Sequence, residues 1–250
     1  MIKIFRSIRQ SLIMEQNNAR YLKYALGEIV LVVVGILIAL QINNWNEDQK
    51  FHKLEIKKLR EISNSLIQTK ANIQQAQEED SRWMHYNEII LEHLEYRKPY
   101  TPELDVSFGS YFWFSRPEIE FSAFEQLKST GLDLVSNDQL RTEIVRLFEK
   151  RFQLIYSENN QWNLEYINVT LPIHLKLFRK VFPETWVPGN DEYAKPIDYD
   201  GLLDNDEFKN LLAENIALRK FGISYYDIAI EECNNLINSI STEINRLEDE

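Results

Sequence analysis

The segment from Ile29 to Leu40 constrains this chain more than any other feature, because every residue in it is apolar or glycine. It lies within GEIVLVVVGILIALQINNWNE, which runs from Gly27 to Glu47. A helix from Tyr24 to Trp45 is about 32 Å long, close to the thickness of the hydrocarbon core of a bilayer. The sequence therefore predicts one N-terminal transmembrane helix over residues 21–45, with the lipid bilayer as its partner.

Aromatic residues mark both ends of this predicted helix. Tyr21 and Tyr24 precede the apolar run and Trp45 follows it, at the depths where amphipathic rings prefer the lipid headgroups. We expect these three side chains to be membrane-interface anchors. A cleaved signal peptide is disfavoured because bulky residues follow the run where small ones are required. A buried helix of a soluble protein would leave the flanking rings unexplained.

The charge is unevenly distributed along the chain. Residues 1–60 carry 10 Lys and Arg against 5 Asp and Glu, and residues 61–250 carry 18 against 34. The acidic part excludes nucleic acid as a partner, because phosphate binding requires a basic patch. Residues 1–20 are basic, and their apolar positions recur at helical spacing. This pattern predicts either an amphipathic segment in the headgroup plane or an unstructured basic tail.

The orientation of the helix does not follow from positive charge, because five Lys or Arg residues lie close to each of its ends. A short N-terminal tail ahead of an uncleaved anchor usually stays in the cytoplasm. We therefore expect a cytoplasmic N-terminus and an external domain over residues 46–250.

One face of the predicted membrane helix is small and polar. At about 100° per residue, Glu28, Gly35, Ala39 and Asn46 fall near one line. Small residues let helix backbones approach one another in lipid, and polar groups there prefer protein partners. This face predicts a helix that associates with itself as a homo-oligomer. Alternatively, Glu28 reaches the nearby interface and Gly35 is incidental.

Residues 46–250 show helical periodicity almost throughout. No proline or glycine occurs from Asn46 to Tyr96, so this helix either continues from the membrane helix or breaks near QQAQEEDSR. Further helices are expected at the following places: 118–131, ending at Gly131; from a capping box at Ser136 and Gln139 onward, with a kink at Pro172; 205–220; and 224–247. Residues 97–116 and 182–206 are expected to be loops. Because no segment has strand periodicity, the sequence predicts an all-α protein, with an antiparallel bundle of five or six helices beyond the membrane helix.

The first of these loops carries four consecutive aromatic residues, Tyr111, Phe112, Trp113 and Phe114. They are expected to plug the core, since buried aromatics usually dominate cores. The alternative is a surface for a ligand or partner, to which Trp186 in the acidic second loop would also belong.

No motif for catalysis or cofactor binding is present. Cys233 is the only cysteine, and the glycines never take the spacing of a nucleotide-binding loop. His85, Glu88 and Glu92 share a helix face, but the carboxylate and histidine order is reversed relative to di-iron bundles and has no second copy. The sequence thus predicts no catalytic residue, cofactor or metal site, and a protein that is not an enzyme.

Two stretches resemble a known family: GEIVLVVVGILIALQINNWNE and FEQLKSTGLDLVSNDQLRTEIVRLFEKRF from Phe124. This is an uncharacterised family of single-pass membrane proteins from Gram-negative bacteria, classed as a domain of unknown function. The resemblance implies a bacterial inner-membrane anchor and a helical domain of similar length, and it implies no activity. With the orientation expected above, residues 46–250 would lie in the periplasm.

Three functions compete at this stage. The leading hypothesis is a membrane-anchored helical interaction or scaffolding protein that associates with itself and with an unknown envelope protein. The alternative is a ligand-sensing helical bundle that works through a partner. The third is an enzyme with an unrecognised carboxylate site. A buried polar pocket near Trp113 or Trp186 would favour sensing, and an exposed apolar face would favour scaffolding.

Overall fold

The computed structural model describes residues 18–182, 184 and 191–249, and it forms two compact units, residues 1–54 and 55–250. The helices, in chain order, are α2 (Asn18–Glu95), α3 (Leu104–Ser110), α4 (Ser122–Thr130), η1 (Leu132–Leu134), α5 (Asp138–Arg146), η2 (Leu147–Arg151), α6 (Phe152–Glu165), η3 (Tyr166–Thr170), α7 (Leu171–Leu177), α8 (Tyr199–Leu202) and α9 (Asp206–Glu248). The strands are β1 (Phe178–Val181) and β2 (Tyr193–Pro196). The predicted all-α class is confirmed.

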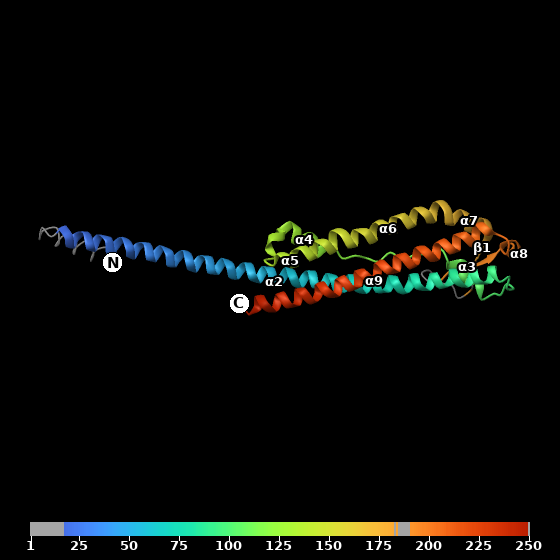
Figure 1. Cartoon of the computed structure of the whole chain (residues 1–250), viewed down its shortest axis with the longest axis horizontal. Helices are drawn as coiled ribbons and strands as arrows, with labels where there is room; N and C mark the ends of the chain where they lie inside the picture. Colours follow the sequence, from blue (N-terminus) through green and yellow to red (C-terminus); the bar gives the residue numbers. More distant parts are fainter. Residues whose placement is uncertain (1–17, 183, 185–190, 250) are drawn as a thin grey trace. The chain divides into compact units, whose positions relative to one another are not determined.

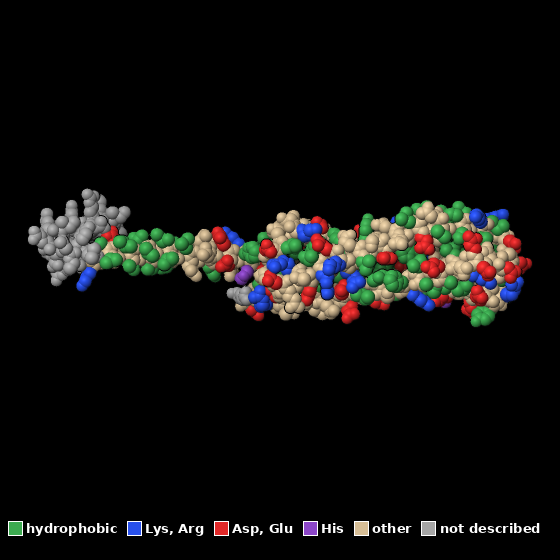
Figure 2. Space-filling view, turned by 45° about the horizontal axis from the view of Figure 1, so that its top comes forward, with side chains coloured by type: hydrophobic (Ala, Val, Ile, Leu, Met, Phe, Trp, Pro, Cys, Tyr) green, Lys and Arg blue, Asp and Glu red, His purple; other side chains and the backbone are tan. Residues whose placement is uncertain are grey.

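The first unit contains the N-terminal part of α2. Between Ile29 and Leu40 its large apolar side chains are exposed, from Val34 at 46% to Leu31 at 64%, and Figure 2 shows this part as a hydrophobic band. By length and composition this helix could cross a membrane. Helix α2 continues without a break through QQAQEEDSR. Of the two expectations for this stretch, a continuous helix or a break, the structure has the continuous helix.

The second unit is built on two long antiparallel helices, the C-terminal part of α2 and α9, which lie side by side in Figure 1. Their cross-contacts run in opposite directions along the chain. Lys70 donates to Asn234 at 3.0 Å and Gln77 donates to Asp227 at 2.6 Å, whereas Arg60 pairs with Glu248. The segment from α5 to α7 packs against this pair, so most side chains of the main core come from three long helical segments.

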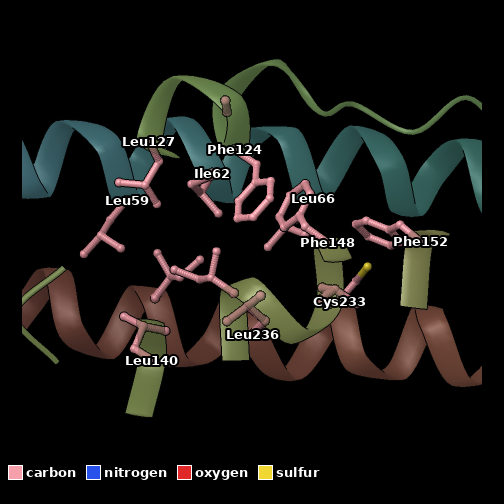
Figure 3. Packing of buried hydrophobic residues seen from close by; sticks show 14 of the residues in the cluster. Leu59, Ile62, Leu66, Phe124, Leu127, Leu140, Phe148, Phe152, Cys233 and Leu236 are labelled. Atoms are coloured by element: carbon pink, nitrogen blue, oxygen red, sulfur yellow. The ribbon is translucent and has the colours of Figure 1, made fainter. Parts of the chain in front are cut away.

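The main core is a close-packed apolar cluster. Figure 3 shows Leu59, Ile62 and Leu66 of α2 facing Phe124 of α4, with α9 on the opposite side. The rings of Phe124 and Phe148 stack at 4.6 Å between centroids. The spacing of three and four residues along α2 places these side chains on one stripe, which explains why this helix could be predicted from its pattern.

A second core lies around α3 and the two strands. Phe108, Tyr111, Phe178 and Phe208 are buried in it. His174 of α7 is only 6% exposed, and its ring lies 4.6 Å from that of Phe112. Burial, together with the charge of Lys180, lowers the pKa of His174 from 6.5 to about 4. This imidazole is therefore neutral at pH 7.

Five details of the sequence prediction were wrong, and one of them is helix α8, which lies in the expected loop 182–206. Residues 104–110 form α3 instead of loop, because Leu104 and Phe108 lie one turn apart and both enter the second core. Strands β1 and β2 pair antiparallel, with Phe178 opposite Pro196, in a region where no strand was expected. Each strand has four residues, too few to show a clear alternation.

The other two details concern helix ends. Helix α9 runs through Gly222, so the two expected helices are one. Helix α5 is capped by Asn137, whose side chain accepts from the backbone N–H groups of Gln139 and Leu140. The Ser136 hydroxyl and backbone N–H instead donate to Glu55, which is fully buried. A buried carboxyl group needs hydrogen-bond donors. Ser136 donates to Glu55 and therefore does not cap the helix.

Candidate functional site

The predicted association face lies on α2 in the first unit. Gly35, Ala39 and Asn46 are exposed, and a Cβ atom added at Gly35 would meet nothing within 4 Å. Glu28 is partly buried. Trp45 is 65% exposed. The side chains of Tyr21 and Tyr24 lie outside the described part of the structure, as does Trp186.

The aromatic run divides between core and surface. Tyr111 is fully buried and Phe112 is 6% exposed, whereas Trp113 is 36% exposed and Phe114 is partly buried. The run therefore supplies two rings to the second core. Its backbone and its later residues border a polar site around Arg219 that was not predicted from the sequence.

The centre of this site is Arg219 of α9, a cation that is only 2% exposed. Its Nη2 donates to the backbone oxygens of Tyr111, at 2.9 Å, and Trp113. Its guanidinium carbon lies 5.5 Å from the centre of the Trp162 ring. Among the described residues, Nε and Nη1 have no hydrogen-bond partner. Three N–H groups of a buried cation are thus left without an acceptor.

Asp80 of α2 is the acidic counterpart of Arg219. It is 8% exposed, and its Oδ1 accepts the backbone N–H of Ser115 at 2.9 Å. Burial raises the pKa of Asp80 to about 6, although this hydrogen bond, the charge of Arg219 and the Tyr226 hydroxyl group act in the opposite direction. Asp80 is therefore mostly ionised at pH 7, and its charge partly offsets that of Arg219.

Burial also disfavours the charged form of Arg219. It lowers the pKa of the guanidinium to about 10, and the charge of Asp80 opposes this change. The group remains cationic at neutral pH. A buried charge is costly unless it is paired and hydrogen-bonded. The charge of Asp80 and the backbone oxygens of Tyr111 and Trp113 offset part of that cost.

A small cleft opens beside these two side chains. Its open space is about 30 Å³. A water molecule needs roughly 10–15 Å³ on the same measure, so the cleft has room for about two water-sized groups. Aromatic and charged side chains from α2, α6 and α9 meet there. The residues that line it are Asp80, Phe114, Ser115, Ile155, Glu158, Trp162, Leu218, Arg219, Phe221, Gly222, Tyr225 and Tyr226.

The cleft offers binding groups and no recognisable reaction centre. It presents one cation, two carboxyl groups and several rings. The residues that line it include no cysteine and no histidine. Among the described residues, no group of three or more His, Cys, Asp or Glu could hold a metal ion. The cleft is thus lined by charges of both signs, from Asp80, Glu158 and Arg219.

Large apolar side chains also reach the surface on α6, η3 and α7. Tyr156 is 59% exposed, Leu164 is 61%, Ile167 is 50% and Leu175 is 66%. Single exposed apolar residues are ordinary on a protein surface. A succession of them along neighbouring elements is more typical of a surface that meets another protein.

Together these observations define an all-α protein with one N-terminal helix long and apolar enough to cross a membrane and a helical domain beyond it. The chain belongs to a family of unknown function, DUF6090, whose model matches residues 28–164. The matched part begins at Glu28 in the apolar helix and ends at Leu164 in α6. Comparison with curated proteins found no match, and comparison with solved structures found none.

Proposed function

We propose that this protein is a single-pass, membrane-anchored helical interaction protein of the bacterial inner membrane. The observation that carries the proposal is the apolar part of α2: none of its most apolar window is buried within the chain. A stretch of this length is costly to expose to water, and a bilayer covers it. The exposed apolar side chains on α6, η3 and α7 add surface for an envelope partner. We place the N-terminus in the cytoplasm and residues 46–250 in the periplasm.

Self-association through Glu28, Gly35, Ala39 and Asn46 belongs to this proposal. Substituting Gly35→Ile adds bulk on that face, and no described atom would clash with the new Cβ atom. We expect the oligomer to dissociate when its size is measured in detergent, because close backbone approach is lost. Gly27→Ile is the matched control: its Cβ atom is equally free, and Gly27 lies about 80° away around the helix. An unchanged oligomer in Gly35→Ile would contradict this association face.

Association with another envelope protein needs a separate test. Crosslinking in intact cells, followed by identification of the copurifying proteins, should recover a second membrane or periplasmic protein. Recovery of this chain alone would count against a scaffolding role and would leave self-association standing.

A ligand-sensing bundle is the second candidate function, and the Arg219 cleft favours it. This cleft is a buried polar pocket whose Arg219 binds the backbone oxygen of Trp113. A sensor of this kind would pass its signal through a partner protein. A ligand that changes the species crosslinked in cells would support this role, and a ligand that binds without such a change would count against it.

A further inference from the structure

The sheet formed by β1 and β2 has one buried face and one exposed face. Phe178 and Ala194 lie on the buried face, in the second core. Side chains alternate along a strand, so Arg179 and Lys195 point to the other side, where both are exposed. These two cations lie directly opposite each other in the strand register. Because like charges at such positions destabilise a sheet, the pair is better explained by an anionic partner than by the fold.

Apolar and aromatic side chains flank the two cations on the same face. Ile197 is 59% exposed. Its backbone N–H donates to the oxygen of Leu177 at 2.9 Å, so the strand pairing continues and Ile197 lies on the same face as Lys195. At the other end of the face Val181 lies opposite Tyr193, and both are partly buried. Cations beside apolar and aromatic side chains are typical of surfaces that lie on lipid headgroups.

The acidic side chains that contact these cations lie deeper than the cations do. The side chain of Lys195 is 53% exposed and lies 3.8 Å from that of Asp105, which is 10% exposed. Lys180 is 43% exposed and pairs with Glu192, which is 17% exposed. Arg179 forms no ion pair within the described part of the chain. The outermost charges on this face are therefore positive.

This positive face belongs to an acidic part of the chain. Residues 61–250 carry 18 Lys and Arg against 34 Asp and Glu, so the domain as a whole has no attraction for an anionic surface. Repulsion from its distant acids is screened beyond about 8 Å at physiological salt. Figure 1 shows β1 beside α7 and α8 at one end of the second unit, where a flat surface could meet the exposed face of the sheet. An acidic protein segment would pair with the cations, whereas a bilayer with anionic headgroups would also cover Ile197.

We propose that the exposed face of the β1–β2 sheet binds the surface of a lipid bilayer with anionic headgroups. Arg179 and Lys195 contact headgroup phosphates, and Ile197 enters the headgroup layer beside them. The inference goes beyond the proposed function, because it gives the second unit a bilayer contact of its own, separate from the anchor in α2.

Sedimentation with vesicles tests this contact. The full chain is held in nanodiscs of phosphatidylcholine, which cover the apolar part of α2, and is mixed with sucrose-loaded vesicles. One set of vesicles contains phosphatidylcholine alone, and the other contains phosphatidylcholine and phosphatidylglycerol in a ratio of two to one. We expect the chain to sediment with the second set only. No sedimentation with the anionic vesicles, or equal sedimentation with both sets, would overturn the proposal.

A charge variant assigns the binding to this face. Each Lys or Arg close to anionic headgroups strengthens binding about fivefold, so Arg179→Gln combined with Lys195→Gln should weaken it by about 30-fold. The Tm of this double variant should not fall, because the opposed like charges are removed. Lys150→Gln combined with Lys220→Gln is the matched control, since it removes two exposed cations from η2 and α9. Unchanged binding in the first double variant, or an equal loss in both, would overturn the proposal.

An apolar variant tests the contribution of Ile197. We expect Ile197→Ser to weaken binding to the anionic vesicles about fivefold, because part of the isoleucine side chain leaves water in the complex. Ile67→Ser is the matched control, as Ile67 is 49% exposed on α2. Equal binding by the two variants would overturn the placement of this face on the bilayer.

Two soluble anions distinguish a bilayer from other anionic partners. Release of the chain from the vesicles by inorganic phosphate at constant ionic strength would show a site for a free anion and overturn the proposal. Binding to polyglutamate but not to the vesicles, lost in Arg179→Gln with Lys195→Gln, would assign the face to an acidic protein and overturn it as well. None of these outcomes bears on the anchor or the association face of α2, which have their own tests.

Discussion

Gly109 and Gly222 have opposite surroundings, although both lie inside helices. A Cβ atom at Gly109 would come within 2.2 Å of the backbone oxygen of Glu192, next to β2, whereas one at Gly222 would meet nothing within 4 Å. Gly109 is therefore required by the close approach of two backbone segments. Gly222 is not required by packing, and glycine in a helix is less stable than alanine.

Gly109→Ala and Gly222→Ala should consequently change stability in opposite directions. We expect Gly109→Ala to lower the free energy of unfolding by about 1–3 kcal/mol, the usual cost of overpacking. Gly222→Ala should raise it by about 0.5–1 kcal/mol. Denaturant unfolding of the full chain in detergent measures both, and each variant is the control for the other. Destabilisation of similar size in both variants would contradict these surroundings.

His174 should make the second core sensitive to acid. Its pKa is about 4 in the folded protein and 6.5 in the unfolded chain, so below pH 6.5 the unfolded chain binds more protons. Stability is then lost as the pH falls from about 6.5 to about 4, by up to about 3 kcal/mol at roughly 1.4 kcal/mol per pKa unit. Asp80 acts in the opposite direction. Its pKa is raised from 3.8 to about 6, so it becomes protonated as the pH falls, and protonation removes the cost of burying its charge.

Comparison with His174→Phe isolates the histidine, because Asp80 is unchanged in both proteins. Phenylalanine fits the chemistry of a site bordered by Phe112 and Phe178, and it removes a buried Nδ1 atom that has no described partner. We expect the variant to retain more of its neutral-pH stability at pH 4.5, measured as Tm across the pH range. Parallel Tm curves for the two proteins would show that His174 does not titrate as described.

At the scale of elements, the start of α5 depends on Asn137. Its side chain accepts from two backbone N–H groups and also donates to Glu243 at 2.8 Å. Asn137→Ala removes the cap and this contact, and we expect it to cost about 1–2 kcal/mol of stability. Asn137→Ser keeps a capping oxygen and should cost less. If Asn137→Ala leaves the urea midpoint unchanged, the helix start is not capped in this way.

Long amphipathic helices were the elements that the sequence predicted best. The part of α2 in the second unit alternates three and four residues between core positions such as Leu59, Ile62 and Leu66, and no proline or glycine interrupts it. Short elements, and helices that contain a glycine, were harder to predict. The sequence predicted two helices, 205–220 and 224–247, but α9 continues through Gly222 between them. Strands β1 and β2 depend on pairing with each other, which local periodicity does not contain.

The Arg219 cleft was missed because four separate parts of the chain build it, from Asp80 to Tyr226. A weak signal was present all the same. In α9, Asn215, Arg219 and Tyr226 follow one another at spacings of four and seven residues on the buried stripe. Polar groups at core positions require partners. That pattern indicates a buried polar site, but only the fold shows which acceptors Arg219 finds.

At the scale of the whole molecule, the two long helices of the second unit bring the C-terminal end of α9 back to the start of that unit. Arg60 of α2 pairs with Glu248, while Arg97 pairs with Asp204 near the start of α9. Within the second unit, the chain thus runs away from its start along α2 and returns along α9. In η1, Leu134 is buried, whereas the side chain of Asp133 is fully exposed and lies 3.7 Å from Arg141.

The side of the membrane on which the second unit lies can be tested through its single cysteine. Cys233 is fully buried, and burial raises the pKa of its thiol to about 12, so the native chain should not react with a maleimide. Asp133→Cys adds one exposed thiol. In intact cells of a Gram-negative host, we expect a maleimide that cannot cross the inner membrane to label this variant and not the unmodified chain. Labelling of Asp133→Cys only after the inner membrane is permeabilised would place the unit in the cytoplasm, and reaction of the unmodified chain would show that its core is open.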